Sequence, residues 1–218
     1  MRILVALALL AMSTSASAVT IGNLYNTGVD NSKVALVANG IDQHWVNGEG
    51  AAYVSGTNGV FPVATNWLAD DATSRWVTPT RNAGDSLDPT TDGIYVFSTS
   101  FSLSGFKPGT ASFSGRFLSD NVVDAVFLNG TQIAGPGGSF TNWTSFSSAG
   151  AVFASDNRLV FRLRNFAMNG GNPAGLRVEF LASNVSAVPE AATWMTLVAG
   201  FGLVGAAARR RRMSSVTA

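Results

Sequence analysis

The stretch Arg158-Leu159-Val160-Phe161-Arg162-Leu163-Arg164 decides the fold class of this chain. Its apolar side chains at 159, 161 and 163 alternate with neighbours that include three arginines. This period of two is typical of a strand with one buried face and one face in water. A helix would instead repeat its apolar positions every three or four residues. The stretch therefore predicts a strand that points Leu159, Phe161 and Leu163 inward.

The same alternation recurs through the middle of the chain, and glycine-rich turns separate the segments that carry it. Asn129-Gly130 predicts a tight hairpin, because both residues accept the positive φ angles of such a turn. At 176–180, Arg177 and Glu179 alternate outward and are expected to form a surface pair. No helical pattern lies between 19 and 187, so the body is predicted to be an all-β, antiparallel β-sandwich. Further strands are expected at 95–103, 111–117 and 122–128, and also at 33–38 and 75–78.

The composition excludes several classes of protein. The 218 residues include no cysteine and only one histidine, which excludes a disulfide scaffold or a cysteine nucleophile and leaves little room for histidine-based metal sites. Between 19 and 188, 9 basic residues face 12 acidic ones, a net charge of −3. A nucleic-acid partner is therefore not expected, although the whole chain carries +1.

The first 18 residues predict a secretory signal peptide. Arg2 precedes an apolar run at 3–12, and the small residues Ala16 and Ala18 form an Ala-x-Ala cleavage site. The apolar run is too short to span a bilayer, which takes about 20 residues. We expect cleavage after Ala18 and a body, residues 19–187, outside the cytoplasm.

The C-terminal end predicts a membrane helix. Residues 191–208 carry no charge, Trp194 lies where an interfacial aromatic would sit, and Arg209, Arg210, Arg211 and Arg212 follow at once. Eighteen residues would rise about 27 Å, near the lower limit for crossing the hydrocarbon layer. The arginines would hold that end in the cytoplasm and place the body on the far side, and residues 213–218 form a short tail.

Val188-Pro189-Glu190, Thr193-Trp194, the glycine-rich helix and the arginine cluster together resemble a PEP-CTERM sorting signal of the Trp-containing subtype. The resemblance covers about the last 31 residues. It implies a Gram-negative host that makes exopolysaccharide, and recognition in the inner membrane by an exosortase, a cysteine transpeptidase-like enzyme. The usual motif reads Pro-Glu-Pro, and Ala191 here replaces its last proline, which bears on whether the tail is removed.

A second resemblance covers roughly residues 95–182. Ala111–Phe117 leading into Asp120-Asn121, followed by Trp143-x-x-Phe146, Asn157–Phe161 and Pro173–Glu179, is similar in order to the galactose-binding-like jelly roll found beside glycoside hydrolases. The resemblance implies a jelly-roll sandwich. It also points to sugar binding, although a fold by itself does not determine function.

The body contains four tryptophans that could stack on sugars, because indole rings pack on the C–H faces of sugars. Trp76, in a short apolar strand, is expected in the core. Trp45 and Trp67 lie in polar surroundings that leave core and surface both open, and Trp143 lies among Thr and Ser residues. The candidate glycan-binding residues are Trp45, Trp67, Trp143 and Asn121.

Acidic residues gather in the expected loops, and related jelly rolls often hold a structural calcium. No spacing matches a known calcium motif, so ordinary turn residues are favoured and no cofactor is expected, with calcium left open. Catalysis is not expected either, since Gly-x-Ser-x-Gly is missing and His44 is the one histidine. The acidic residues in question are Asp70, Asp71, Asp85, Asp88, Asp92, Asp120 and Asp124.

The sequence thus predicts an exported, non-catalytic protein of the cell surface or exopolysaccharide matrix, anchored for a time in the inner membrane. Its body is expected to bind carbohydrate. The alternatives are a structural or adhesive matrix protein without a glycan ligand and, third, a glycan-active enzyme, for which Asp70, Asp120, Glu49 and Glu179 are the available carboxylates.

Overall fold

A computed structural model describes residues 18–188 and 191–213. Residues 18–186 form one compact unit, and helix α1 (Ala191–Met213) belongs to another, so each is described by itself. Ala16 of the predicted cleavage site, and Pro189 and Glu190 of the predicted sorting motif, lie outside the described residues. Ala18 is described, and it begins strand β1.

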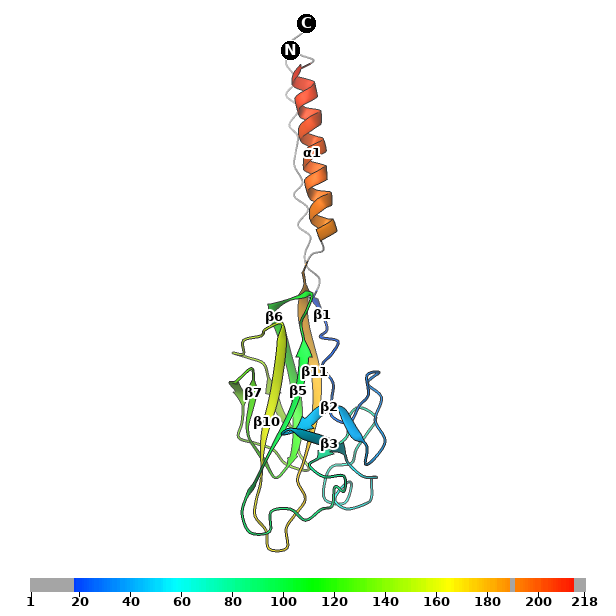
Figure 1. Cartoon of the computed structure of the whole chain (residues 1–218), viewed down its shortest axis with the longest axis vertical. Helices are drawn as coiled ribbons and strands as arrows, with labels where there is room; N and C mark the ends of the chain where they lie inside the picture. The colour runs from blue at the N-terminus through cyan, green and yellow to red at the C-terminus, as the bar shows by residue number, and fades with distance from the viewer. Residues whose placement is uncertain (1–17, 189–190, 214–218) are drawn as a thin grey trace. The chain divides into compact units, whose positions relative to one another are not determined.

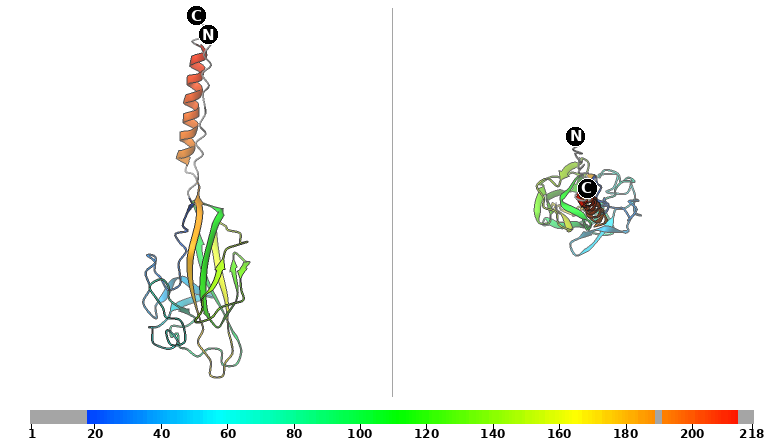
Figure 2. Two further views of the ribbon diagram at one scale, coloured as in Figure 1. Left: turned by 180° about the vertical axis from the view of Figure 1, so that it is seen from behind. Right: turned by 90° about the horizontal axis from the view of Figure 1, so that it is seen from above.

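The body is antiparallel β throughout its described strand pairs, which confirms the all-β class predicted from the alternating sequence (Figure 1). The long strands form two neighbouring pairs, β5 with β10 and β6 with β11, and loops from residues 20–92 gather to one side of them (Figures 1 and 2). The strands are β1 (Ala18–Val19), β2 (Ile41–Asn47), β3 (Gly50–Val54), β4 (Val77–Thr78), β5 (Gly93–Ser102), β6 (Phe106–Asp120), β7 (Val122–Leu128), β8 (Thr131–Ala134), β9 (Thr144–Ser147), β10 (Asp156–Asn165) and β11 (Gly175–Ala187).

The strands form one strongly curled sheet in the order β8-β7-β10-β5-β2-β3-β4-β11-β6-β9, with β1 added on β11. The curl makes the sheet nearly closed, so that β10 and its neighbours face β6 and its neighbours across an apolar interior. Aromatic rings join the two sides: Phe161 on β10 lies 5.5 Å from Phe117 on β6 and 5.4 Å from Phe146 on β9, measured between ring centroids. Edge-to-face pairs of this kind add roughly 0.5–1.5 kcal/mol each beyond their burial.

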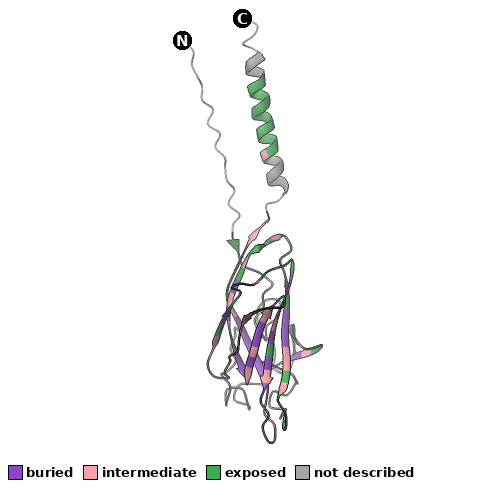
Figure 3. Ribbon diagram, turned by 90° about the vertical axis from the view of Figure 1, so that its left-hand side faces the viewer, coloured by how far each residue is buried: buried purple, intermediate pink, exposed green. Residues whose placement is uncertain are grey.

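The strand that the sequence singled out is central in this arrangement. β10 pairs with β5 on one side and β7 on the other. Leu159, Phe161 and Leu163 are fully buried, whereas Arg158 and Arg162 are exposed, as the alternation predicted. Buried and exposed residues both occur along the strands of the body (Figure 3). A strand hydrogen-bonded on both sides cannot slip its register without turning these three side chains out of the core.

The predicted hairpin is confirmed. β7 and β8 pair across Asn129 and Gly130, whose φ angles of 50° and 83° are the left-handed values that such a turn requires. The Asn129 side chain also accepts a hydrogen bond from the Arg158 amide at 2.9 Å, which ties the turn to the start of β10.

The strand predicted at 33–38 is wrong. That segment has only an isolated bridge between Val29 and Ala35. Lys33 takes a left-handed φ of 62°, and Val34 and Val37 are exposed, because no neighbouring strand is available to pair with the segment. The strand expected at 75–78 is shortened to Val77–Thr78.

Arg177 and Glu179 form the predicted ion pair, but its predicted place at the surface is wrong, because both side chains are buried, at 0% and 1% exposure. The loop 69–74 covers this outer face of β11. Arg177 donates hydrogen bonds to the Ala69 carbonyl and to Ser74 Oγ (2.6 Å), and it pairs with Asp71 (2.8 Å) and Glu179 (3.3 Å). The first five residues of β11, 175–179, are thus buried on both faces, which a pattern of alternating polarity does not reveal.

The chain from Ala191 to Met213 is helical, in agreement with the helix predicted at 191–208. In the part of the chain that the structure describes, no helix is both long enough and apolar enough to cross a membrane. The side chains of Trp194 and Arg210–Arg212 lie outside the description.

Removing the carboxylate of Glu179 should destabilise the body strongly. We expect Glu179→Ala to lower the free energy of unfolding by about 3–5 kcal/mol, because it leaves a buried guanidinium short of charge compensation. Urea denaturation at pH 7 measures the loss. Glu49→Ala, which removes an exposed acidic side chain, is the matched control and should change stability by less than about 0.5 kcal/mol. Equal effects of the two substitutions would contradict the stabilising role assigned to the ion pairs of Arg177.

Candidate functional site

The corner between β6 and β7 is where the chain crosses from one side of the curled sheet to the other. Only Asn121 separates the two strands, yet β6 bonds to β9 and β11 whereas β7 bonds to β8 and β10. The corner is held internally by a hydrogen bond from Ser119 Oγ to the Asn121 carbonyl at 3.0 Å. Its two polar residues, Asp120 and Asn121, consequently lie at an end of the sheet, within reach of the loops there.

Two loops are tied to this corner by specific hydrogen bonds. The Trp67 indole donates to Asp120 Oδ2 at 2.7 Å, and the Phe166 amide donates to Asn121 Oδ1 at 2.6 Å. A third loop joins them, since the Leu68 amide donates to the Phe140 carbonyl at 2.8 Å. The corner and its loops are therefore fixed relative to one another before any ligand arrives.

A glycine makes room for the indole. A Cβ atom at Gly175, the first residue of β11, would lie 2.6 Å from the Trp67 ring. Trp67 can therefore pack closely against the start of β11 and against Trp76, whose ring is tilted by 31° and whose centroid is 4.4 Å away. This packing leaves Trp67 only 3% exposed and sets the direction of its indole N–H.

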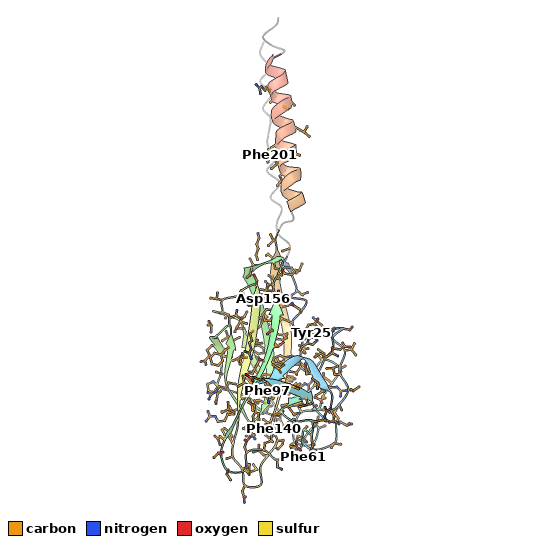
Figure 4. The ribbon with its side chains drawn as sticks, viewed as in Figure 1. Tyr25, Phe61, Phe97, Phe140, Asp156 and Phe201 are labelled. Carbon is orange, nitrogen blue, oxygen red and sulfur yellow. The ribbon has the colours of Figure 1, made fainter. Side chains whose placement is uncertain are left out.

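These segments enclose a pocket of about 340 Å³, which we call the corner pocket. Phe61 and Phe140, both substantially exposed, lie together at this end of the body (Figure 4). The walls combine apolar rings with amide and hydroxyl groups, and Asp120 is the single ionisable side chain among the described residues that line it. The lining residues are Phe61, Pro62, Asn66, Trp67, Ser86, Asp120, Asn121, Phe140, Met168, Gly171, Asn172 and Pro173.

Asp120 is buried in the pocket wall, at 6% exposure. Burial raises the pKa of its carboxyl to about 6, and the hydrogen bond from Trp67 opposes this rise only in part. Its other oxygen accepts a hydrogen bond from the Asn121 amide at 2.6 Å. Both donors are neutral, and no ion-pair partner for Asp120 exists among the described residues.

The structure brings together two of the four candidate glycan-binding residues, Trp67 and Asn121, in the corner pocket. Trp45 is fully buried in the main core, where its indole donates to the Tyr25 carbonyl at 3.1 Å. Trp143 is half-buried, with the guanidinium carbons of Arg116 and Arg177 lying 4.2 and 5.1 Å from its ring centroid. Stacking on a sugar needs an open ring face, so the positions of Trp45 and Trp143 do not fit that role. Trp67, at 3% exposure, does not fit it either, and contributes to the pocket wall through its hydrogen bond to Asp120.

Other acidic residues of the body stabilise loops and turns by accepting hydrogen bonds. Asp70 accepts hydrogen bonds from Ser55 Oγ and from the Trp76 amide, and Asp42 accepts three from the backbone between Gly28 and Trp45. Burial raises the pKa of both carboxyls, against the effect of these hydrogen bonds. Within residues 18–188 and 191–213, no three His, Asp or Glu side chains are grouped so as to hold a metal ion.

Sequence reasoning missed most of the pocket lining, including its large apolar residues Phe61, Phe140 and Met168. Each lies in an irregular segment rich in Gly, Pro, Asn or Thr, where no periodicity exists to assign a face. One signal could have pointed to them: they are large apolar residues in loops, and loops normally expose polar residues to water. Exposed apolar residues in a loop indicate a binding surface.

Comparison with known proteins finds no family model that matches this chain and no similar curated protein. We therefore infer function from the residues and geometry of the corner pocket and from the sequence of the two ends.

The indole N–H resonance of Trp67 should report the titration of Asp120. We expect its NMR shift to change with a midpoint near pH 6, because protonation weakens the carboxylate that accepts its hydrogen bond. Asp120→Asn is the matched control, and it should remove this midpoint. A Trp67 resonance that stays constant between about pH 5 and 7 in the wild type would refute the assignment.

The same titration has a consequence for stability. The raised pKa means that the folded state binds the Asp120 proton more tightly than the unfolded chain, so folding is favoured less as pH rises through this range. Relative to Asp120→Asn, the wild type should lose up to about 3 kcal/mol of unfolding free energy between roughly pH 4 and 7. Asp42 and Asp70 titrate in both proteins, so the difference between the two isolates Asp120.

Proposed function

We propose that this chain is an exported, non-catalytic protein of the cell surface or exopolysaccharide matrix whose body binds carbohydrate in the corner pocket. The observation that carries the proposal is the lining of that pocket: exposed aromatic rings beside a cluster of amide, hydroxyl and carboxylate groups. A sugar presents an apolar C–H face and a rim of hydroxyl groups, and this lining offers a partner to each. Small-molecule sites in general combine mostly apolar walls with a few placed polar groups.

The pocket chemistry supports binding better than hydrolysis. Cleavage of a glycosidic bond normally uses two carboxyl groups on opposite sides of the scissile bond. Among the described lining residues, the corner pocket has one, Asp120. His44 is not among the lining residues, and its ring stacks on Tyr25 with 3.6 Å between centroids. The curled antiparallel sheet is, in this proposal, a jelly-roll sandwich of the galactose-binding-like type.

The ends of the chain supply the delivery part of the proposal, and its support is the sequence. Residues 1–18 would direct export, and residues 188–212 would act as a PEP-CTERM-like sorting signal recognised by an exosortase. In this proposal the exosortase acts on the tail at the inner membrane, and the body then reaches the surface or matrix. Its final partners would be exopolysaccharide or a cell-surface glycan.

Substitution of the exposed rings should weaken polysaccharide binding. We expect Phe61→Ala and Phe140→Ala each to reduce retention of the purified protein on host exopolysaccharide about tenfold, the loss of one well-placed aromatic contact. Co-sedimentation measures retention, and circular dichroism checks the fold. Val152→Ala, which trims an apolar side chain that is 73% exposed and lies outside the pocket lining, should bind as the wild type does. A wild-type protein that binds no polysaccharide would favour the structural matrix protein instead.

The tail should direct sorting on its own. We expect residues 188–218, fused to a secreted reporter in a Gram-negative host that makes an exosortase, to deliver the reporter to the surface or medium. Replacement of Arg209–Arg212 by alanine is the matched control and should leave the reporter missorted, because the stop at the cytoplasmic side is lost. Cell fractionation measures the distribution. Unchanged sorting after deletion of the tail would refute this part of the proposal.

A further inference from the structure

The electrostatics of the corner pocket restrict its ligand more than the lining composition does. The Asp120 residue is only 6% exposed, and its two carboxylate oxygens accept hydrogen bonds from the Trp67 indole and the Asn121 amide. An ionised carboxylate in such a place normally has a basic partner. Here none of the described lining residues is basic, so the pocket carries an uncompensated negative charge.

This arrangement is unfavourable for folding. A buried carboxylate without a counter-charge destabilises the folded state, and burial raises the pKa of the Asp120 carboxyl. The contrast with Glu179 is direct: that buried carboxylate pairs with Arg116 at 2.6 Å and with Arg177 at 3.3 Å. A buried acid that is left unpaired within a pocket is a candidate for ligand binding.

The rings at the pocket mouth favour the same sign of ligand charge. Phe61 is 52% exposed and Phe140 is 38% exposed, and the face of an aromatic ring attracts a cation. Each Asp120 oxygen accepts one hydrogen bond in the structure and has a second lone pair for a further donor. An ammonium group supplies both the charge and the donors.

We propose that the corner pocket selects a sugar with a free, protonated amino group over the N-acetylated or neutral sugar. This inference rests on the proposed carbohydrate binding and adds to it the class of ligand. The ammonium group pairs with Asp120 at the buried wall, and the apolar face of the sugar ring packs against Phe61 and Phe140. Acetylation removes the charge and adds bulk where the carboxylate lies.

The test compares oligomers of glucosamine and of N-acetylglucosamine, equal in length, as ligands for the purified protein at about pH 6.5, where both the carboxylate and the amine are substantially charged. Calorimetry measures affinity. We expect the glucosamine oligomer to bind at least tenfold more tightly, and Asp120→Asn to remove the preference. Phe61→Ala should weaken both oligomers.

A charge control separates a specific site from general attraction to an acidic protein. Asp156→Asn removes an exposed carboxylate that lies far along the body from Phe61 and Phe140, and it should leave the preference intact (Figure 4). Loss of the preference in this variant, or its survival in Asp120→Asn, would overturn the inference. The Trp67 indole resonance confirms in each variant that the pocket is folded.

The outcomes distinguish this inference from the proposed function. Equal or tighter binding of the N-acetylated oligomer, or binding of host exopolysaccharide but of neither oligomer, refutes the amine preference and leaves carbohydrate binding in place. Binding of no saccharide at all refutes both. Tighter binding of a lysine oligomer of equal length would assign the pocket to a basic protein segment and would overturn the sugar ligand.

Discussion

The buried guanidinium of Arg177 is the contact on which the arrangement of the outer loops depends. It joins β11 to the loop 69–74 through the Ala69 carbonyl, Ser74 and Asp71, and Glu179 balances its charge from the same strand. Because a buried charge is tolerated only with its partners in place, the loop has one stable position on the sheet. Trp67 stands two residues before that loop, so the network also determines where the wall of the corner pocket lies.

The corner pocket follows from the path of the chain. β6 and β7 lie on different sides of the curled sheet, and the single residue between them leaves the polar side chains of the corner in contact with loops from three distant segments. Hydrogen bonds from Trp67 and Phe166 hold those loops against it. A site that is assembled before the ligand arrives loses little conformational entropy on binding, which favours affinity for a small polar ligand such as a sugar.

Periodicity identified the strands that are polar on one face, and it failed where both faces are covered or where no partner strand exists. Leu159, Phe161 and Leu163 point inward as their spacing indicates. Arg177 and Glu179 follow the same spacing but are buried, because a loop far away in sequence covers their face. Residues 33–38 have strand-like composition, but a strand needs a neighbouring strand for its hydrogen bonds. The local sequence does not show whether such a neighbour is present. Of the candidate site, Trp67 and Asn121 were reachable from the sequence, while Phe61, Phe140 and Met168 lie in loops without a pattern.

The sequence by itself determined the all-β class, the direction of the β10 side chains and the hairpin at Asn129-Gly130, because each of these depends on neighbours within a few residues. Tertiary structure alone decided that Trp45 belongs to the core whereas Trp67 lines a pocket, and it alone left Asp120 buried without a basic partner. The physical reason is that burial and charge compensation are properties of contacts between segments, such as the 53 residues that separate Trp67 from Asp120. Local spacing carries no record of such contacts.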